Sequence, residues 1–165
     1  MKRITKTIFF LCIAVCLSGC SKSAKNEEEM LQIITKENNI SKESSIQVIG
    51  TIELENASLI CTMTGDSNQG HSYYATEFEK NGKKYEYIHD YKLYDRGMDM
   101  YSLPWSSGYV FLSNNEKSNS LRIIKDGKEE IITIDKIPFV YYYDTSGISN
   151  FEYFFLDEDE EAISL

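Results

Sequence analysis

From Ser45 to the C-terminus, short runs rich in Val, Ile, Tyr and Phe are separated by turn residues. This is the pattern of β-strands joined by tight turns. Two of the turns are explicit, because Asn81-Gly82 and Asp126-Gly127 are pairs that tolerate the positive φ angles of two-residue hairpin loops. No long helical run alternates with the strands, so a parallel βαβ sheet is excluded. We expect mainly antiparallel strands.

One helix is predicted before the strands, over about residues 27–38. Asn26 followed by Glu29 resembles a helix-starting cap, and the acidic first turn suits the helix dipole. Met30, Ile33 and Ile34 follow at helical spacing and form an apolar stripe. The predicted fold class is therefore α+β, with this short amphipathic helix packed on one curled sheet of about seven to nine strands.

The two hairpins also predict strand registers. A two-residue loop at Asn81-Gly82 places Phe78 opposite Tyr85. At Asp126-Gly127, a two-residue loop would pair Arg122 with Ile131, whereas a bulged three-residue loop would pair Arg122 with Glu130. The bulged loop is favoured because it matches opposite charges.

The first nineteen residues have the layout of a secretory signal. Lys2, Arg3 and Lys6 precede an apolar run of ten residues from Ile8 to Leu17, which ends at the small pair Ser18-Gly19. Ten helical residues rise only about 15 Å, roughly half the thickness of the hydrocarbon core. The run is therefore predicted to be removed rather than to span the membrane.

Leu17-Ser18-Gly19-Cys20 resembles the lipobox of bacterial lipoproteins. The resemblance implies cleavage between Gly19 and Cys20, with acyl chains added to the Cys20 sulfur. It divides the chain into a signal peptide (1–19), a lipidated tether (20–26) and a single β-rich domain (27–165). The alternative is an ordinary secretory signal with a coincidental cysteine. The expected location is the outer face of the cell membrane, held by lipid.

The rest of the chain also resembles, in composition, the small exported lipoproteins of Gram-positive bacteria. Loss of the three positive charges in 1–19 takes the net charge from −9 to −12, which disfavours binding to nucleic acid. Cys61 is then the one cysteine left besides Cys20, so no internal disulfide can form. Its place in an alternating run predicts a buried, inert thiol.

No pattern of catalytic, metal-binding or cofactor-binding residues stands out. His71 and His89 lack zinc-site spacing, and no nucleophile motif or phosphate-binding glycine loop occurs. Residues 157–161 are five consecutive carboxylates, from Asp157 to Glu161. We interpret them as a solvated turn before a short final strand at 162–165, with calcium binding as the alternative.

Aromatic residues are the one compositional excess, with 12 tyrosines between Tyr73 and Tyr153. Sheet packing accounts for most of them. The least regular stretch, 90–107, is predicted to be a long loop, and its aromatic residues form the predicted binding surface. These residues are Tyr91, Tyr94, Tyr101 and Trp105.

These features favour a non-catalytic envelope protein that binds a partner protein or cell-wall glycan. The alternatives are an envelope hydrolase that uses two carboxylates brought together in space, and an accessory subunit of a transport or signalling system.

Overall fold

The computed structural model of the chain describes residues 22–65, 71–93 and 98–163. These residues form one helix, α1 (Glu27–Glu37), and eleven strands, which confirms the α+β fold class. The strands are β1 (Ser23–Ala24), β2 (Ile46–Glu53), β3 (Ala57–Thr64), β4 (Ser72–Asn81), β5 (Lys84–Leu93), β6 (Met100–Trp105), β7 (Gly108–Ser113), β8 (Ser120–Lys125), β9 (Lys128–Thr133), β10 (Phe139–Asp144) and β11 (Phe151–Leu156).

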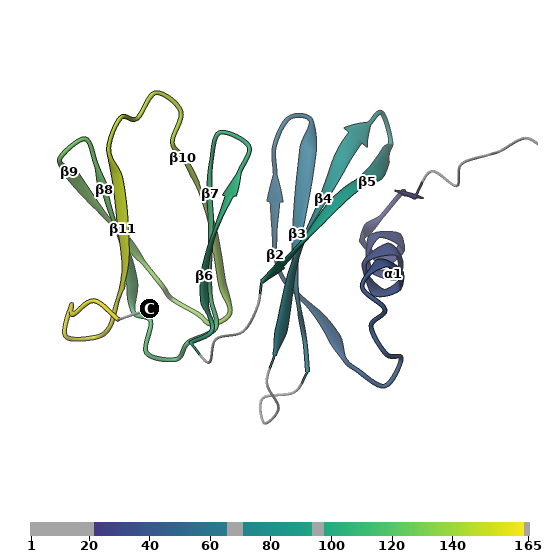
Figure 1. The fold of residues 1–165 in the computed structure, drawn as a ribbon, viewed down its shortest axis with the longest axis horizontal. Helices are drawn as coiled ribbons and strands as arrows, with labels where there is room; N and C mark the ends of the chain where they lie inside the picture. The colour runs from purple at the N-terminus through teal and green to yellow at the C-terminus, as the bar shows by residue number, and fades with distance from the viewer. Residues whose placement is uncertain (1–21, 66–70, 94–97, 164–165) are drawn as a thin grey trace, which may run out of the picture.

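The elements form four stacked layers (Figure 1). α1 covers one face of a five-stranded sheet, sheet A, with strand order β1-β5-β4-β3-β2. The other face of sheet A packs on the three-stranded sheet B, with order β10-β7-β6. The far face of sheet B packs on the three-stranded sheet C, with order β11-β8-β9. All paired strands are antiparallel.

The helix begins where the sequence predicts and ends one residue earlier. The Asn26 side chain accepts a hydrogen bond from the Glu29 backbone N–H at 2.9 Å, and the Glu29 carboxylate accepts one from the Lys25 N–H at 2.8 Å. Met30 and Ile34 are buried against Ile60 and Phe78 of sheet A, among others. The cap therefore sets the start of α1, and the apolar stripe sets the face that it buries.

Sheet B lies in the middle of the stack, and its strands are covered on both faces. Val110 and Leu112 of β7 pack toward sheet A, whereas the intervening Phe111 packs toward sheet C. The run 109–112 is apolar at every position, which is typical of a strand without a solvated face.

The single curled sheet of seven to nine strands is therefore a wrong prediction. A strand such as β7 needs an apolar layer on each side, and one sheet with one helix provides too few layers. The stretch 90–107 is also misread as a loop, because residues 90–93 complete β5 and residues 100–105 form β6.

The first hairpin is shifted from its predicted register. Asn81 stays in β4 and pairs with Lys84, so the loop is Gly82-Lys83 and Phe78 faces Tyr87 instead of Tyr85. Gly82 has φ +64°, while Asn81 is not among the residues with positive φ. A single positive φ at the first loop position is the requirement of a type II′ turn, and glycine meets it without steric cost.

The second hairpin adopts the register that the charges disfavour. Arg122 pairs with Ile131, and Asp126-Gly127 form a two-residue loop with φ +46° and +77°. The Asp126 carboxylate accepts hydrogen bonds from two backbone N–H groups of the β10–β11 turn, at 3.0 and 3.2 Å. The bulged loop is therefore wrong, because turn geometry and these bonds outweigh one exposed ion pair.

Sheets A and B also meet along one edge, where β2 approaches β10. A Cβ atom on Gly50 would lie 2.6 Å from the Val140 Cβ, so only glycine permits this approach. The register of β2 shifts between Val48 and Gly50, which marks a β-bulge at this point.

Candidate functional site

The predicted aromatic binding surface is largely interior. Trp105 is 3% exposed and packs with Val110 and Leu112 between sheets A and B. Its ring meets Tyr142 edge-on, with centroids 5.8 Å apart. Pairing of β6 with β7 directs Trp105 into the core, so it cannot contact a partner as part of a surface loop.

Tyr91 and Tyr101 pack at the border of the same core and are half-buried. The Tyr101 ring lies 5.0 Å from that of Tyr73, and the Tyr91 hydroxyl donates to Glu77 at 3.4 Å. Tyr94 lies outside the described residues. Every tyrosine in the part of the chain that the structure describes is buried or half-buried, so packing explains the tyrosine excess there.

A polar cleft of about 660 Å³ opens where the ends of sheets A and B meet, and we call it the interlayer cleft. Its walls come from six separate stretches of the chain, which is why no sequence motif marks it. The lining residues are Ser45, Gln47, Met63, Gly65, His71, Met98, Asp99, Asn114, Asn115, Glu116 and Ile137.

Hydrogen bonds hold the walls of the interlayer cleft in place. The Tyr73 hydroxyl donates to Asp99 Oδ1 at 2.7 Å, and burial together with this carboxylate raises the pKa of Tyr73. Asn115 Nδ2 donates to the Met98 carbonyl at 3.0 Å. By contrast, Nδ1 of His71 is a buried atom without a hydrogen-bond partner among the described residues. The cleft thus combines walls held by hydrogen bonds with one buried polar atom whose hydrogen-bonding capacity is unused among the described residues.

The groups in the interlayer cleft can bind a ligand through hydrogen bonds. Asp99 already accepts the Tyr73 proton in a hydrogen bond, which gives this carboxylate a structural role. Hydroxyl, amide and imidazole groups can pair with the hydroxyl groups of a ligand, each as donor or acceptor.

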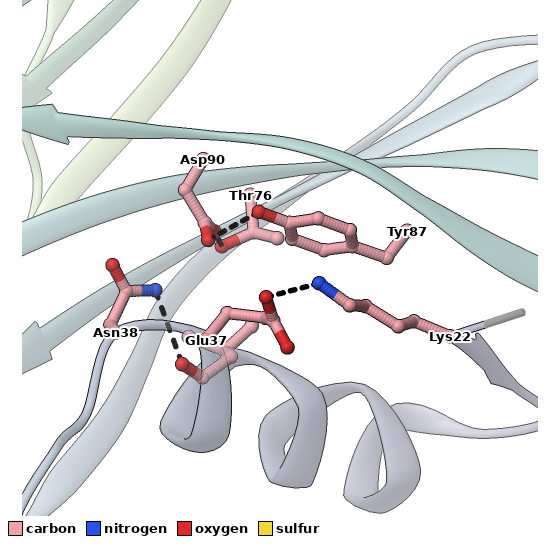
Figure 2. Close-up of polar contacts among 7 residues, drawn as sticks. Lys22, Glu37, Asn38, Thr76, Tyr87 and Asp90 are labelled. Carbon is pink, nitrogen blue, oxygen red and sulfur yellow. Dashed lines mark hydrogen bonds and ion pairs between the residues drawn. The ribbon is translucent and has the colours of Figure 1, made fainter. Parts of the chain in front are cut away.

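A second polar cluster joins the start of the described chain to sheet A, and we call it the anchor junction (Figure 2). The Lys22 ammonium forms an ion pair with Glu37 at the end of α1 and lies 4.8 Å from the centre of the Tyr87 ring. The Lys22 carbonyl accepts a hydrogen bond from the Tyr87 N–H at 2.8 Å. Both ends of this lysine are therefore fixed to the domain.

Asp90 joins the anchor junction on the side of sheet A, next to Thr76 and the Tyr87 hydroxyl (Figure 2). Its carboxylate accepts hydrogen bonds from the hydroxyl of buried Thr76 at 2.6 Å and from that of Tyr87 at 2.8 Å. Burial and the neighbouring Asp90 carboxylate raise the pKa of Tyr87, so this hydroxyl stays protonated and continues to donate.

The anchor junction also changes the picture of residues 20–26, the predicted tether. Ser23 and Ala24 pair with Glu86 and Tyr85 as strand β1, and Ala24 is fully buried. The chain is thus part of the domain from Lys22 onward. Gly19 and Cys20, the predicted cleavage and lipidation residues, lie outside the described residues.

The acidic run 157–161 forms a turn, as the first interpretation predicts. Asp157 Oδ1 accepts hydrogen bonds from the N–H groups of Asp159 and Glu161, and Leu156 bridges to Ala162 beyond the turn. Residues 164–165 of the predicted final strand lie outside the described part of the chain. Within that part, no three His, Cys, Asp or Glu side chains converge on a possible metal position, so the calcium alternative receives no support.

Cys61 lies in the core between sheets A and B and is fully buried, and burial raises the pKa of its thiol to about 12. The predicted burial of the thiol is confirmed, and a buried, protonated thiol is a poor nucleophile. His89 packs edge-on against Tyr91, with ring centroids 4.8 Å apart.

The chain matches no protein-family model, no curated protein and no solved structure with which it has been compared. Among the residues that the structure describes, no helix has the length and apolar character needed to cross a membrane.

Proposed function

We propose that this chain is an exported lipoprotein, held at the outer face of the cell membrane through Cys20, whose domain binds a ligand without catalysis. The observation that carries the proposal is how close to Cys20 the chain is already part of the fold. Lys22, two residues after Cys20, is already hydrogen-bonded to sheet A. A folded chain this close to the lipobox cysteine suits a mature protein that starts at that cysteine.

The interlayer cleft is the proposed ligand site. It is lined by side chains that exchange hydrogen bonds with hydroxyl groups, among them Gln47, Asn114 and Asn115. A cell-wall glycan is the hydroxyl-rich class of ligand that an exported protein meets. The glycan is therefore proposed ahead of a partner protein.

The anchor is tested by replacing Cys20 with Ser in the full chain. Wild-type protein should be in the membrane fraction, with an N-terminal peptide that begins at Cys20 and carries the mass of acyl chains. Cys20→Ser should lose that mass and leave the membrane fraction. Cys16→Ser is the matched control, because it changes a cysteine within the predicted signal and should be processed as wild type. An unmodified Cys20 in wild-type protein would contradict the proposal.

Ligand binding is tested by placing a photo-crosslinking residue at Gln47, which is exposed and lines the interlayer cleft. Gln32, exposed on the outer face of α1, is the matched control. In intact cells, crosslinking from Gln47 should yield adducts whose wall fragments are identified by mass after digestion of the glycan. Equal adduct yields from the two positions would exclude the cleft as the binding site.

A further inference from the structure

We propose that the outer edge of β5 faces the lipid bilayer, with the lysines of the β4–β5 hairpin against anionic headgroups. This inference rests on the proposed anchor at Cys20 and adds an orientation to it. Three observations on the structure support it: the reach of the chain, an exposed apolar residue, and the exposed lysines at the hairpin turn.

The chain between the anchor and the domain is very short. The Lys22 carbonyl is bonded to the Tyr87 N–H, and Ser23 pairs with Glu86. From Cys20 to Lys22 there are two residue steps, which span at most about 7 Å when fully extended. The acyl chains on Cys20 must therefore enter the bilayer close to Tyr87, on the side of sheet A where β1 ends.

The outer edge of β5 next to this point carries an exposed apolar side chain. β1 covers only two residues of β5, and Ile88 follows directly after Tyr87. The β4–β5 register shifts at this point, so Ile88 is the extra residue of a β-bulge. It is 49% exposed, and the other large exposed hydrophobic residue in the described part of the chain is Ile131 at 53%. Ile131 lies on β9, in the layer farthest from α1 (Figure 1).

Two adjacent lysines stand at the turn of the hairpin beside this edge, although the mature chain has a net charge of −12. Lys83 and Lys84 at the hairpin turn, and Lys25 after β1, are exposed and form no ion pair among the described residues. The carboxylates nearest the turn lie on the strands behind it: Glu79 and Glu86 face each other across β4 and β5, and Glu86 accepts a hydrogen bond from Asn81 Nδ2.

Three further carboxylates, Glu27, Glu28 and Glu29, lie in the first turn of α1, where the helix dipole favours negative charge. Anionic headgroups attract lysines within about one Debye length, roughly 8 Å, and repel the acidic remainder of the domain. Both effects turn the β4–β5 hairpin toward the membrane and sheet C away from it.

The orientation is tested on lipidated full-length protein purified from membranes and reconstituted into phosphatidylglycerol vesicles with nitroxide-labelled headgroups. Ile88→Cys and Ile131→Cys form a matched pair for a thiol-reactive fluorophore, because both sites are exposed and Cys61 is buried with a pKa of about 12. Fluorescence at position 88 should be quenched at least about threefold more than at position 131. Equal quenching, or stronger quenching at position 131, would overturn the proposal.

The role of charge is tested with Lys83→Glu and Lys84→Glu together, in the two fluorophore backgrounds. The difference in quenching between positions 88 and 131 should fall in these variants. It should persist when Lys125 and Lys128, which flank the turn of the second hairpin, are changed to Glu instead. An equal fall in both charge variants would remove the hairpin lysines from the proposal.

Failure of the anchor and failure of the orientation give different results. If the protein does not float with the vesicles and the Cys20 peptide lacks acyl mass, the anchor and the orientation both fail. If the protein floats and the two positions are quenched equally, only the orientation fails.

Discussion

The two outer interfaces of the layer stack are built in different ways. Between sheets B and C, aromatic rings pack on one another: Tyr109 stacks on Phe151 with centroids 5.1 Å apart, and Phe111 lies 4.9 Å from Tyr153. Between α1 and sheet A, the apolar cluster is smaller and adjoins the hydrogen-bonded group of Thr76, Tyr87 and Asp90.

This difference separates two sources of stability. Aromatic packing depends on buried area and tolerates small changes of angle, whereas a buried polar group depends on each partner being present. The interface between α1 and sheet A thus depends on the geometry of specific hydrogen bonds. The interface between sheets B and C depends on the packing of aromatic rings. We expect amide hydrogen exchange to be slowest in β7 and faster in α1.

The largest effect is expected at the centre of the aromatic interface. Phe111→Ala removes a fully buried ring and should lower the free energy of unfolding by about 3–5 kcal/mol, measured by urea denaturation. Ile131→Ala, at an exposed site, is the control and should change it by less than about 0.5 kcal/mol. A Phe111→Ala loss below about 1 kcal/mol would show that the aromatic layer does not carry this share of stability.

A smaller loss is expected from the polar interface. Asp90→Ala leaves the Thr76 and Tyr87 hydroxyls without their acceptor and should cost about 1–3 kcal/mol in the same assay. Asp159→Ala removes a carboxylate from the exposed acidic turn and should be near neutral. Equal effects from the two substitutions would mean that the Asp90 hydrogen bonds contribute nothing net.

Alkaline pH should weaken the anchor-side interface through Tyr87. Its pKa is raised in the folded protein, so above pH 10 the unfolded chain loses this proton while the folded chain keeps it. The unfolded state then binds fewer protons, and stability, complete below about pH 10, falls as the pH rises. Melting temperatures from pH 8 to 11 should fall less steeply for Tyr87→Phe than for wild type. Identical slopes would exclude Tyr87 as a source of the pH dependence.

The smallest effect is expected from the ion pair at the start of the described chain. Lys22→Ala removes the contact with Glu37, which is partly exposed, and should cost about 0–1 kcal/mol. Its visible consequence should be local, as faster hydrogen exchange at Tyr87, whose N–H is bonded to the Lys22 carbonyl. Unchanged exchange at Tyr87 would mean that backbone pairing alone holds β1.

The two hairpins show how far sequence patterns can be used. Asn-Gly and Asp-Gly both mark turns correctly, yet the positive φ angles begin at Gly82 in one and at Asp126 in the other. The identity of the Asn-Gly or Asp-Gly pair therefore does not by itself predict which residue is the first of the loop. In the second hairpin, Asp126 is also bonded to backbone groups at residues 149–150, which are distant in sequence.

The candidate sites show the same limit. Trp105 and Tyr101 stand out in composition, but alternation along β6 places their side chains on the core side once β7 pairs with it. The interlayer cleft assembles from segments between Ser45 and Ile137, and no spacing within one segment reveals it.

The sequence by itself determined the local features: the capped helix, the presence and approximate position of most strands, and the buried, unpaired Cys61. Each depends on neighbouring residues and on periodicity, so each is visible in a short window. Only the tertiary structure decided the three-sheet stack, the interlayer cleft and the joining of Lys22 to β5. These depend on contacts between distant segments, which form because a middle sheet that is apolar on both faces must be covered on both.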